Sequence, residues 1–253
     1  MGRRLERVLS ITDRFGPSPA LSQQVDEAGR YWGDTSSPSW SNNSHRRDGV
    51  GDEAFVELGR DHLAMFRRFA KALDRPPSPG AVIEWGCGGG AIAAGFAPVA
   101  DSFVGTDLSE ENLTECRRQV AAVCDTPVET LLVDVAHPEK AVEGRDNSFD
   151  TFICLYVFEV MAAPEEVFRL LRIAERILKP GGMAFVQFKY QKAGWQPPRV
   201  KRNYHRNLSV RSTFAIEDFW VKAGDCGLTP QMMTLVPQNR FDERYAYVAL
   251  TKP

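Results

Sequence analysis

The 253-residue sequence lacks several features that define specialised protein classes. Its five cysteines include no C-x-x-C pair, and their odd number argues against a fully paired disulfide framework. No stretch approaches the ~20 apolar residues of a membrane span, and the basic start lacks a signal-peptide core. A net charge of −2 argues against a general nucleic-acid-coating protein. We therefore expect a cytoplasmic protein that is not held in a membrane.

Clusters of Asp, Glu, His or Cys at metal-ligand spacing are also lacking, so we predict no metal site. The composition, 43% apolar and 25% charged, is ordinary for a chain with a substantial core. We expect a domain over residues 51–253 and an appended helical cap over residues 1–50. Within the cap, residues 31–49 carry three large aromatics and no helical or strand period. They form either a binding loop or a loop whose tryptophans pack on the core.

Four glycines fall within five positions after a short apolar run in residues 81–90, A-V-I-E-W-G-C-G-G-G. The apolar residues predict a buried first strand, and the glycines predict a turn at which another group approaches the backbone closely. A helix expected from Ala91 onward would point its N-terminal amides toward this turn. The turn is therefore a predicted ligand site.

The acid in this stretch, followed by G-x-G-x-G, resembles the S-adenosylmethionine (SAM) site of class I methyltransferases. The resemblance implies cofactor contacts from Glu84, Gly86, Cys87, Gly88 and Gly90. The same glycines also fit the dinucleotide fingerprint G-x-G-x-x-G/A, which leaves a nicotinamide oxidoreductase as an alternative.

A second acid, Asp107, ends the strand predicted over residues 102–107 and lies 21 residues beyond Gly86. A carboxylate at this point can accept hydrogen bonds from both ribose hydroxyls of a nucleoside, a role that fits either cofactor. The alternative is that Asp107 or Ser109 caps the next helix. Leu108 belongs to the same predicted cofactor site.

A third acid, Asp134, ends the strand predicted over residues 128–134. The resemblance implies that an acid here accepts from the exocyclic amine of adenine, while the backbone amide of Val135 serves the ring. Three strands that end in acids are a stronger indication of an adenosine cofactor than any one of them.

Residues 148–160 resemble the fourth strand of the family and the segment beneath the donated methyl group. Cys154 is the predicted cofactor neighbour in this strand. The usual pattern ends in Glu-His, whereas here Glu159 is followed by Val160, which cannot take a proton from a substrate. A general base, where the acceptor needs one, must come from elsewhere.

His45 and His205 are the candidate bases, because each lies in a polar segment expected to flank the mouth of the site. Tyr156 and Glu159 are candidates for orienting the acceptor. A hydroxyl acceptor benefits from a general base, whereas a carboxylate, a phenolate or an amine needs little help.

The rest of the pattern alternates helices and strands. An amphipathic helix is predicted over residues 52–73, with His62 on its surface. The sequence L-K-P-G-G (residues 178–182) predicts a tight turn before a fifth strand, and residues 229–236 and 245–251 predict a closing hairpin. We therefore expect a Rossmann-like, doubly wound, seven-stranded and mostly parallel α/β sheet with an antiparallel C-terminal strand and an N-terminal helical cap.

Residues 189–213 contain no acid and seven basic side chains, interleaved with aromatic rings. The resemblance implies that such an insertion lies over the mouth of the active site. A cationic, aromatic lid would attract an anionic or ring-bearing acceptor, although the same composition also suits RNA. A solvated loop is the remaining interpretation.

The sequence thus predicts a SAM-dependent methyltransferase that acts on a small molecule, at an oxygen of an anionic, sugar or aromatic compound. An RNA or protein methyltransferase and a non-catalytic SAM-binding protein are the alternatives. A monomer and a homodimer are both open.

Overall fold

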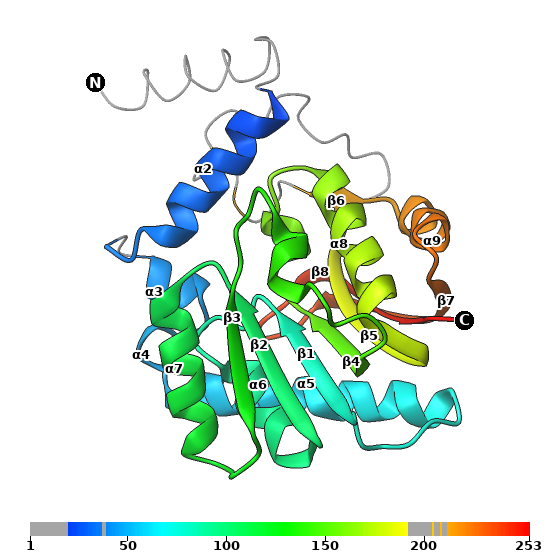
Figure 1. Ribbon diagram of the computed structural model, residues 1–253, viewed down its shortest axis with the longest axis horizontal. Helices are drawn as coiled ribbons and strands as arrows, with labels where there is room; N and C mark the ends of the chain where they lie inside the picture. Colours follow the sequence, from blue (N-terminus) through cyan, green and yellow to red (C-terminus); the bar gives the residue numbers. More distant parts are fainter. Residues whose placement is uncertain (1–19, 37–38, 192–203, 205–207, 209–211) are drawn as a thin grey trace.

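The structure is a computed structural model that describes residues 20–36, 39–191, 204, 208 and 212–253 (Figure 1). The predicted base His205 and most of the 189–213 insertion lie outside the described residues. Within them, a central sheet separates two layers of helices, as the sequence predicts.

The sheet consists of β1 (Ala81–Trp85), β2 (Ser102–Asp107), β3 (Val128–Leu132), β4 (Phe149–Cys154), β5 (Leu178–Tyr190), β6 (Thr213–Phe214), β7 (Thr229–Gln238) and β8 (Glu243–Thr251). Its order is β3-β2-β1-β4-β5-β8-β7, and β6 pairs with β5. The strands from β3 to β5 are parallel, and β8 runs antiparallel to both β5 and β7. The predicted seven strands are confirmed, and the two-residue β6 adds an eighth in the described part of the chain.

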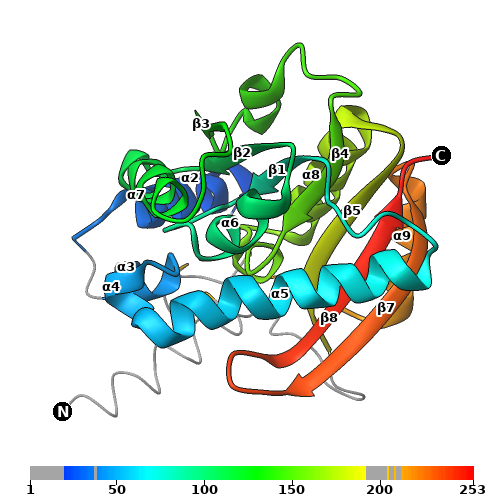
Figure 2. The ribbon, with the colours of Figure 1, turned by 90° about the horizontal axis from the view of Figure 1, so that it is seen from below.

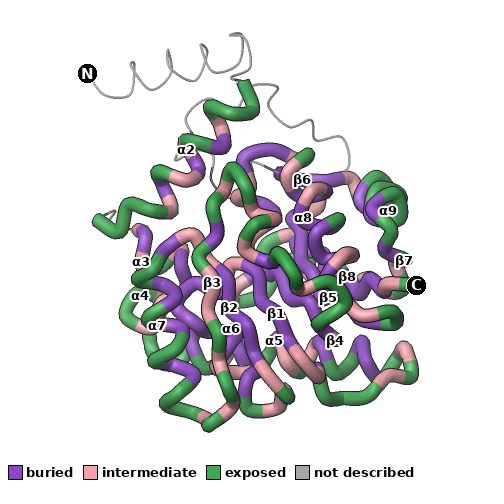
Figure 3. The backbone as a smooth tube through the Cα atoms, viewed as in Figure 1, coloured by how far each residue is buried: buried purple, intermediate pink, exposed green. Residues whose placement is uncertain are grey.

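The helices are α2 (Leu21–Gly33), α3 (Trp40–Asn43), α4 (Arg47–Val50), α5 (Asp52–Ala72), α6 (Ala91–Phe96), α7 (Glu110–Ala121), α8 (Pro164–Ile177) and α9 (Ile216–Asp225), with short 3-10 turns η1 (Ala97–Val99), η2 (Pro138–Val142) and η3 (Phe158–Val160). Apolar side chains of α5, α6 and α7 pack on one face of the sheet, and those of α8 and α9 pack on the other. Figure 2 shows α5 running across the strands, and Figure 3 shows buried strands beneath helices with exposed outer faces. None of the helices within the described ranges is long and apolar enough to cross a membrane.

The order of the strands positions the site. After β1 the chain moves outward to β2 and β3, then returns to place β4 on the other side of β1. In doubly wound sheets, ligands bind in the crevice beyond the carboxyl ends of the strands at such a reversal. The glycine-rich turn follows β1 directly, so it lies at this crevice.

Two local predictions are wrong. Residues 31–49 contain the end of α2 and the one-turn helices α3 and α4, which are too short to show a period in the sequence. The K-P-G-G sequence is part of β5, which begins at Leu178 directly after α8. The reason is pairing with the end of β8: the Gly181 amide donates to the Lys252 carbonyl at 2.9 Å, and the Lys252 amide donates to the Gly182 carbonyl at 3.0 Å.

Candidate functional site

The glycine-rich turn is packed so closely that side chains would not fit. Gly88 has a φ of +50°, and a Cβ placed on it would lie 2.3 Å from the Ser44 carbonyl oxygen. A Cβ on Gly86, which has a φ of +76°, would lie 2.4 Å from a methyl carbon of Val157. The amide of Gly89 donates to the Ser44 oxygen at 2.7 Å. The turn therefore lies between the N-terminal segment and the chain that follows β4, at a position that only glycine tolerates.

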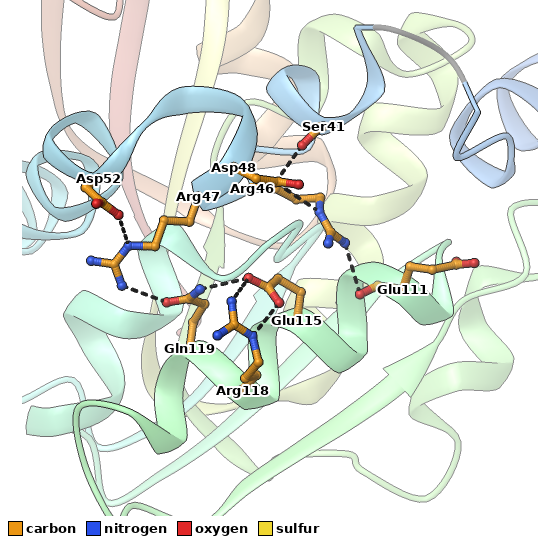
Figure 4. Close-up of polar contacts among 9 residues, drawn as sticks. All are labelled: Ser41, Arg46, Arg47, Asp48, Asp52, Glu111, Glu115, Arg118 and Gln119. Atoms are coloured by element: carbon orange, nitrogen blue, oxygen red, sulfur yellow. Dashed lines mark hydrogen bonds and ion pairs between the residues drawn. The ribbon is translucent and has the colours of Figure 1, made fainter.

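The N-terminal segment is held against this turn by contacts with α7 (Figure 4). Arg46 donates to the backbone carbonyl of Glu111 at 3.3 Å. Arg47 donates to the side chain of Gln119 at 3.1 Å and to Asp52 at 2.6 Å. These contacts fix α3 and α4 on the domain, with Ser44 and His45 beside the glycines.

Asp107 lies where β2 ends, and its carboxylate is oriented by three donors. These are the Gly88 amide at 2.9 Å, the Ser109 amide at 3.0 Å and the Asn112 side-chain amide at 3.1 Å. Burial raises the pKa of Asp107, against the hydrogen bonds, which lower it. The hydroxyl of Ser109 caps α7 by accepting from the Asn112 amide. Ser109 therefore fills the capping role that was the alternative for Asp107.

Glu84 is 2% exposed, and its Oε2 has no hydrogen-bond partner among the described residues. Burial, with a contribution from the nearby Asp107 charge, raises the pKa of Glu84 to about 8. A buried carboxylate oxygen without a donor is costly unless a ligand supplies one. The glycine turn thus lies beside an acid that can pair with a cationic group.

A first cavity of about 130 Å³ opens beside the turn. Its lining at the strand ends includes Gly86, Gly88, Asp107 and Leu108, and its apolar wall includes Val133 and Val135. Val25, Ala28 and Trp32 of α2 and Tyr204 line it from the other side, so α2 lies beyond the carboxyl ends of β1 and β2. The indole nitrogen of Trp32 donates to the Tyr204 hydroxyl at 2.8 Å.

Five predicted cofactor residues therefore line the first cavity: Gly86, Gly88, Asp107, Leu108 and Val135. The other five do not: Glu84, Cys87, Gly90, Asp134 and Cys154. The Cys87 sulfur packs toward Gly105 and Cys116, and Cys154 is fully buried. Because β3 ends at Leu132, Asp134 lies beyond the strand in an exposed turn, where its carboxylate accepts from the Ala136 amide at 2.9 Å.

A second cavity of about 460 Å³ adjoins the first. The two share five lining residues, Trp32, Asn43, His45, Tyr156 and Val160. The remaining lining of the second cavity includes Glu159, Tyr245, Phe241 and Arg240. Three of the four catalytic candidates, His45, Tyr156 and Glu159, thus lie around one space.

Tyr156 stands between the cavities in a constrained conformation. It has a φ of +60°, which is uncommon for a residue with a side chain. Its amide donates to Gln187 at 2.8 Å, and its hydroxyl donates to Asp242 at 2.8 Å. Both partners are buried. These contacts hold the Tyr156 ring where it lines both cavities.

His62 is buried, so the prediction of a helix-surface histidine is wrong. Its Nδ1 lies 2.6 Å from the Leu58 carbonyl oxygen, and its Nε2 lies 2.8 Å from the Tyr247 hydroxyl and 3.2 Å from the Tyr156 hydroxyl. Burial lowers the pKa of His62. A carbonyl oxygen can only accept, so Nδ1 donates to the Leu58 carbonyl. His62 therefore belongs to the polar network under Tyr156.

His45 packs its ring on Tyr156 at 4.6 Å between ring centroids, in an edge-on arrangement. Burial lowers the pKa of His45 to about 4. Its imidazole is therefore neutral near pH 7 and is a weak base.

Glu159 differs from His45 because burial raises its pKa instead of lowering it. It is 3% exposed, its Oε1 accepts from the Tyr245 hydroxyl at 2.7 Å, and its Oε2 has no partner among the described residues. Burial raises the pKa of Glu159 to about 7.

Sequence reasoning missed Gln187, Asp242, Tyr245 and Tyr247. The signal that could have found two of them is the Y-A-Y sequence in a strand predicted to be buried. Side chains two positions apart share one face of a strand, so two buried tyrosines there need polar partners.

The fold and this site define a Rossmann-like α/β domain with a nucleoside-type cavity at the carboxyl ends of β1 and β2. Residues 83–186 match the family described as a methyltransferase domain. The matched stretch contains the glycine-rich turn and Asp107, so this part of the chain is similar to a methyltransferase domain. The match favours a methyltransferase over the nicotinamide enzymes that share the glycine pattern.

Curated relatives match about two fifths of the chain. It is 32% identical over 107 residues to a ubiquinone biosynthesis O-methyltransferase of Neisseria meningitidis, which covers 41% of this chain and 42% of the relative. It is 27% identical over 107 residues to a probable methyltransferase of Aspergillus luteorubrus, covering 40% of this chain and 37% of that one. The chain thus spans about two fifths of the length of these relatives.

Two solved structures share the fold over most of the chain. A magnesium protoporphyrin IX methyltransferase from Synechocystis, crystallised with bound SAH (S-adenosylhomocysteine), has a TM-score of 0.63 at 15% identity, over 91% of this chain and 100% of that one. A 1,6-didemethyltoxoflavin-N1-methyltransferase from Burkholderia thailandensis has a TM-score of 0.64 at 18% identity, over 94% and 92%.

Proposed function

We propose that the protein transfers a methyl group from SAM to an oxygen of a small-molecule acceptor. The observation that carries this proposal is the pair of adjoining cavities. One lies at the glycine turn and Asp107, and the other meets it at Tyr156 and His45. A methyl donor and an acceptor bound in the two cavities would meet beside Tyr156.

The residues of the first cavity fit the parts of SAM. The Asp107 carboxylate suits the ribose hydroxyls, and the apolar side chains of Leu108, Val133 and Val135 suit the adenine ring. The partnerless Glu84 oxygen, next to the turn, suits the positively charged amino group. Because 130 Å³ is below the roughly 300–1,000 Å³ of small-molecule sites, we expect α2 and Tyr204 to move outward when the cofactor binds.

When bound, SAM supplies a methyl group on a positively charged sulfonium. The protein must hold the acceptor oxygen in line with that methyl group and exclude water. Orientation of this kind contributes effective molarities of roughly 10⁵ M or more. Tyr156, held on both its amide and its hydroxyl, and the cover formed by Trp32 and Tyr204 are suited to these two tasks.

The names of the relatives support oxygen as the methylated atom, since several are O-methyltransferases. The anionic acceptor expected from the 189–213 insertion has less support. Lys189 belongs to β5 and is buried, and most of the other basic residues lie outside the described part of the chain. The rings of Trp32, Tyr156, Phe241 and Tyr245 in the second cavity favour an aromatic acceptor. Free thiols on all five cysteines suit the cytoplasmic location predicted from the sequence.

Calorimetric titration with SAH, NAD and NADP tests the cofactor. We expect SAH to bind and neither nicotinamide nucleotide to do so; binding of a nicotinamide nucleotide alone would overturn the proposal. Mass spectrometry after incubation with SAM and small hydroxyl compounds, bulk RNA or a peptide mixture tests the acceptor. One added methyl mass on a hydroxyl compound supports the proposal. Methylation of only RNA or peptide supports the corresponding alternative, and binding without any transfer supports a non-catalytic protein.

A further inference from the structure

We propose that the second cavity accepts an uncharged, ring-bearing hydroxyl compound and that Oε2 of Glu159 receives the hydroxyl proton during methyl transfer. This inference rests on the proposed function, and it adds the class of acceptor and the base. The base is then the carboxylate of Glu159. It lies one residue before Val160, which stands where the family pattern has a histidine.

The shape and lining of the second cavity point to a ring. Its 460 Å³ lies within the roughly 300–1,000 Å³ of small-molecule sites. Trp32, Tyr156, Phe241 and Tyr245 contribute aromatic rings to its walls. Aromatic walls favour a flat acceptor through stacked and edge-on contacts.

The charges around the cavity disfavour an anion. Arg240, 52% exposed, is the basic residue among its described lining, and it is already paired with Glu57 and, at 3.2 Å, with Glu53. His45 is neutral near pH 7 because burial lowers its pKa. An anionic acceptor would therefore bring a second negative charge toward Glu159 without a free cation to balance it.

Glu159 itself is arranged to accept a proton. Tyr245 donates to Oε1 and fixes the carboxyl group, and Oε2 has no donor among the described residues. Glu159 is one of the residues that line the second cavity. Leaving a buried carboxylate oxygen unpaired is costly, and a hydroxyl of a bound acceptor would satisfy it. The unpaired oxygen thus indicates a ligand that donates a hydrogen bond.

The groups that face Glu159 come from three neighbouring elements. Tyr245 of β8 lowers the pKa of Glu159 through its hydrogen bond, and Lys189 of β5 lowers it through its charge. Asp242, between β7 and β8, raises it. Burial outweighs these contributions and brings the pKa to about 7, close to the value at which a general base works best near neutral pH.

The acceptor oxygen forms a bond to the methyl carbon, the electron pair of the sulfur–methyl bond stays with sulfur, and the hydroxyl proton moves to Glu159 Oε2. Solvent takes that proton after the product leaves. No further reactant is needed.

The test compares Glu159→Gln with wild type and with Glu217→Gln, which changes an exposed glutamate at the start of α9. Catechol, guaiacol and 2-naphthol serve as uncharged acceptors, and 3,4-dihydroxybenzoate is the anionic counterpart of catechol. We expect Glu159→Gln to lower kcat about 100-fold or more and to remove the fall in rate below pH 7. Glu217→Gln should match wild type. Catechol should exceed its anionic counterpart about 10-fold in kcat/KM, which corresponds to about 1.4 kcal/mol, because the anion is repelled by Glu159.

Tyr245→Phe keeps the carboxyl group and removes its donor. Loss of this hydrogen bond raises the pKa of Glu159, so the acidic limb of the rate profile should move to higher pH. Infrared difference spectra of the acceptor-free protein between about pH 6 and pH 8 provide a readout without turnover. The carboxylic-acid signal that titrates near pH 7 should shift in Tyr245→Phe and be missing in Glu159→Gln, whereas the signal of Glu84, which titrates near pH 8, should remain in both variants.

Binding of SAH distinguishes a failure of the proposed function from a failure of the role assigned to Glu159. If neither wild type nor variants bind SAH, the proposed function fails. If all bind SAH and Glu159→Gln keeps the wild-type rate profile, the assignment of Glu159 is overturned. Preferred methylation of the anionic compound, or SAH binding with no transfer to any uncharged acceptor, overturns the acceptor class and leaves the cofactor site standing.

Discussion

The two cavities share a wall but are built in different ways. The first is built mainly at the ends of neighbouring parallel strands, from a glycine turn, a carboxylate and short apolar side chains. The second depends on side chains from distant segments, since Tyr156 is held by Gln187 of β5 and by Asp242 between β7 and β8. His62 of α5 and Tyr247 of β8 complete this support.

The difference concerns how each cavity is kept in shape. Around the first, backbone hydrogen bonds of the turn fix the geometry: the amides of Gly86 and Cys87 donate to the Thr106 carbonyl at 2.9 and 2.8 Å. Around the second, exchange of one side chain affects several others, because both carboxylate oxygens of Asp242 accept from more than one side chain. We therefore expect the second cavity to change more easily by mutation than the first.

The largest expected effect is on the support of the second cavity. Asp242, 4% exposed, accepts from the hydroxyls of Tyr156 at 2.8 Å and Tyr247 at 2.7 Å. Asp242→Ala should lower the free energy of unfolding by about 3 kcal/mol, since buried hydroxyls lose a charged acceptor. Urea unfolding measures this loss, with the exposed Asp225→Ala as control. Equal free energies of unfolding for the two variants would show that the hydrogen bonds of Asp242 do not stabilise the protein.

The corresponding change in the first cavity should act on affinity. Asp107→Ala removes the carboxylate that the Gly88 amide and Asn112 orient, and with it the hydrogen bonds that we propose for the ribose. We expect SAH to bind about 100-fold more weakly, or about 2.7 kcal/mol. Calorimetry measures this change. The control is Asp101→Ala, at the exposed residue that precedes β2, and this variant should bind SAH with the wild-type affinity. An affinity within 3-fold of wild type would remove Asp107 from the site.

The first cavity could be predicted from the sequence because its determinants are local. The glycine spacing and the acid at the end of residues 102–107 lie within one strand–turn–helix–strand unit. The prediction fails for the acid after the third strand. The sequence pattern predicts that Asp134 ends this strand, but β3 ends two residues earlier, and the Asp134 carboxylate lies in an exposed turn.

The second cavity could be predicted only in part, since Tyr156 and Glu159 follow a family-like strand whereas their partners do not. His62 lies four residues from both Leu58 and Phe66, on the apolar face of α5, so its spacing indicates burial and only its polar side chain suggested the surface. Its ring packs against Tyr247 of β8, a partner that the sequence does not indicate. No local pattern links Asp242 to Tyr156, 86 residues earlier. Burial of a polar side chain is a tertiary property, and it was the least predictable feature of this site.

Glu84 allows a smaller, pH-dependent test of the first cavity. Its pKa is raised from 4.5 to about 8, so the folded state holds a proton that the unfolded state releases. The free energy of unfolding should therefore fall as the pH rises from about 4.5 to 8. Between pH 7 and 8 the fall due to Glu84 is about 1 kcal/mol. Glu159, whose pKa is about 7, has already lost half of its proton at pH 7 and contributes less over this interval.

Glu84→Gln should remove this slope in urea unfolding at the two pH values, whereas exposed Glu143→Gln should keep it. A cationic ligand next to Glu84 favours the ionised form, so SAH binding at pH 7 should release a proton in wild type. Calorimetry in two buffers of different ionisation enthalpy detects this release. A wild-type slope in Glu84→Gln would mean that another group titrates.

The smallest effect is expected at Asp134, for which the family resemblance implies a hydrogen bond from the adenine amine. Its side chain is exposed and already accepts from the Ala136 amide at 2.9 Å, so water competes for any further donor. A hydrogen bond of this kind contributes about 1 kcal/mol, and Asp134→Ala should weaken SAH binding about 5-fold or less, measured beside exposed Asp125→Ala. A loss near that of Asp107→Ala would mean that the turn after β3 closes inward on the cofactor. In that event the first cavity, like the second, would owe its final shape to side chains that the ligand-free arrangement leaves apart.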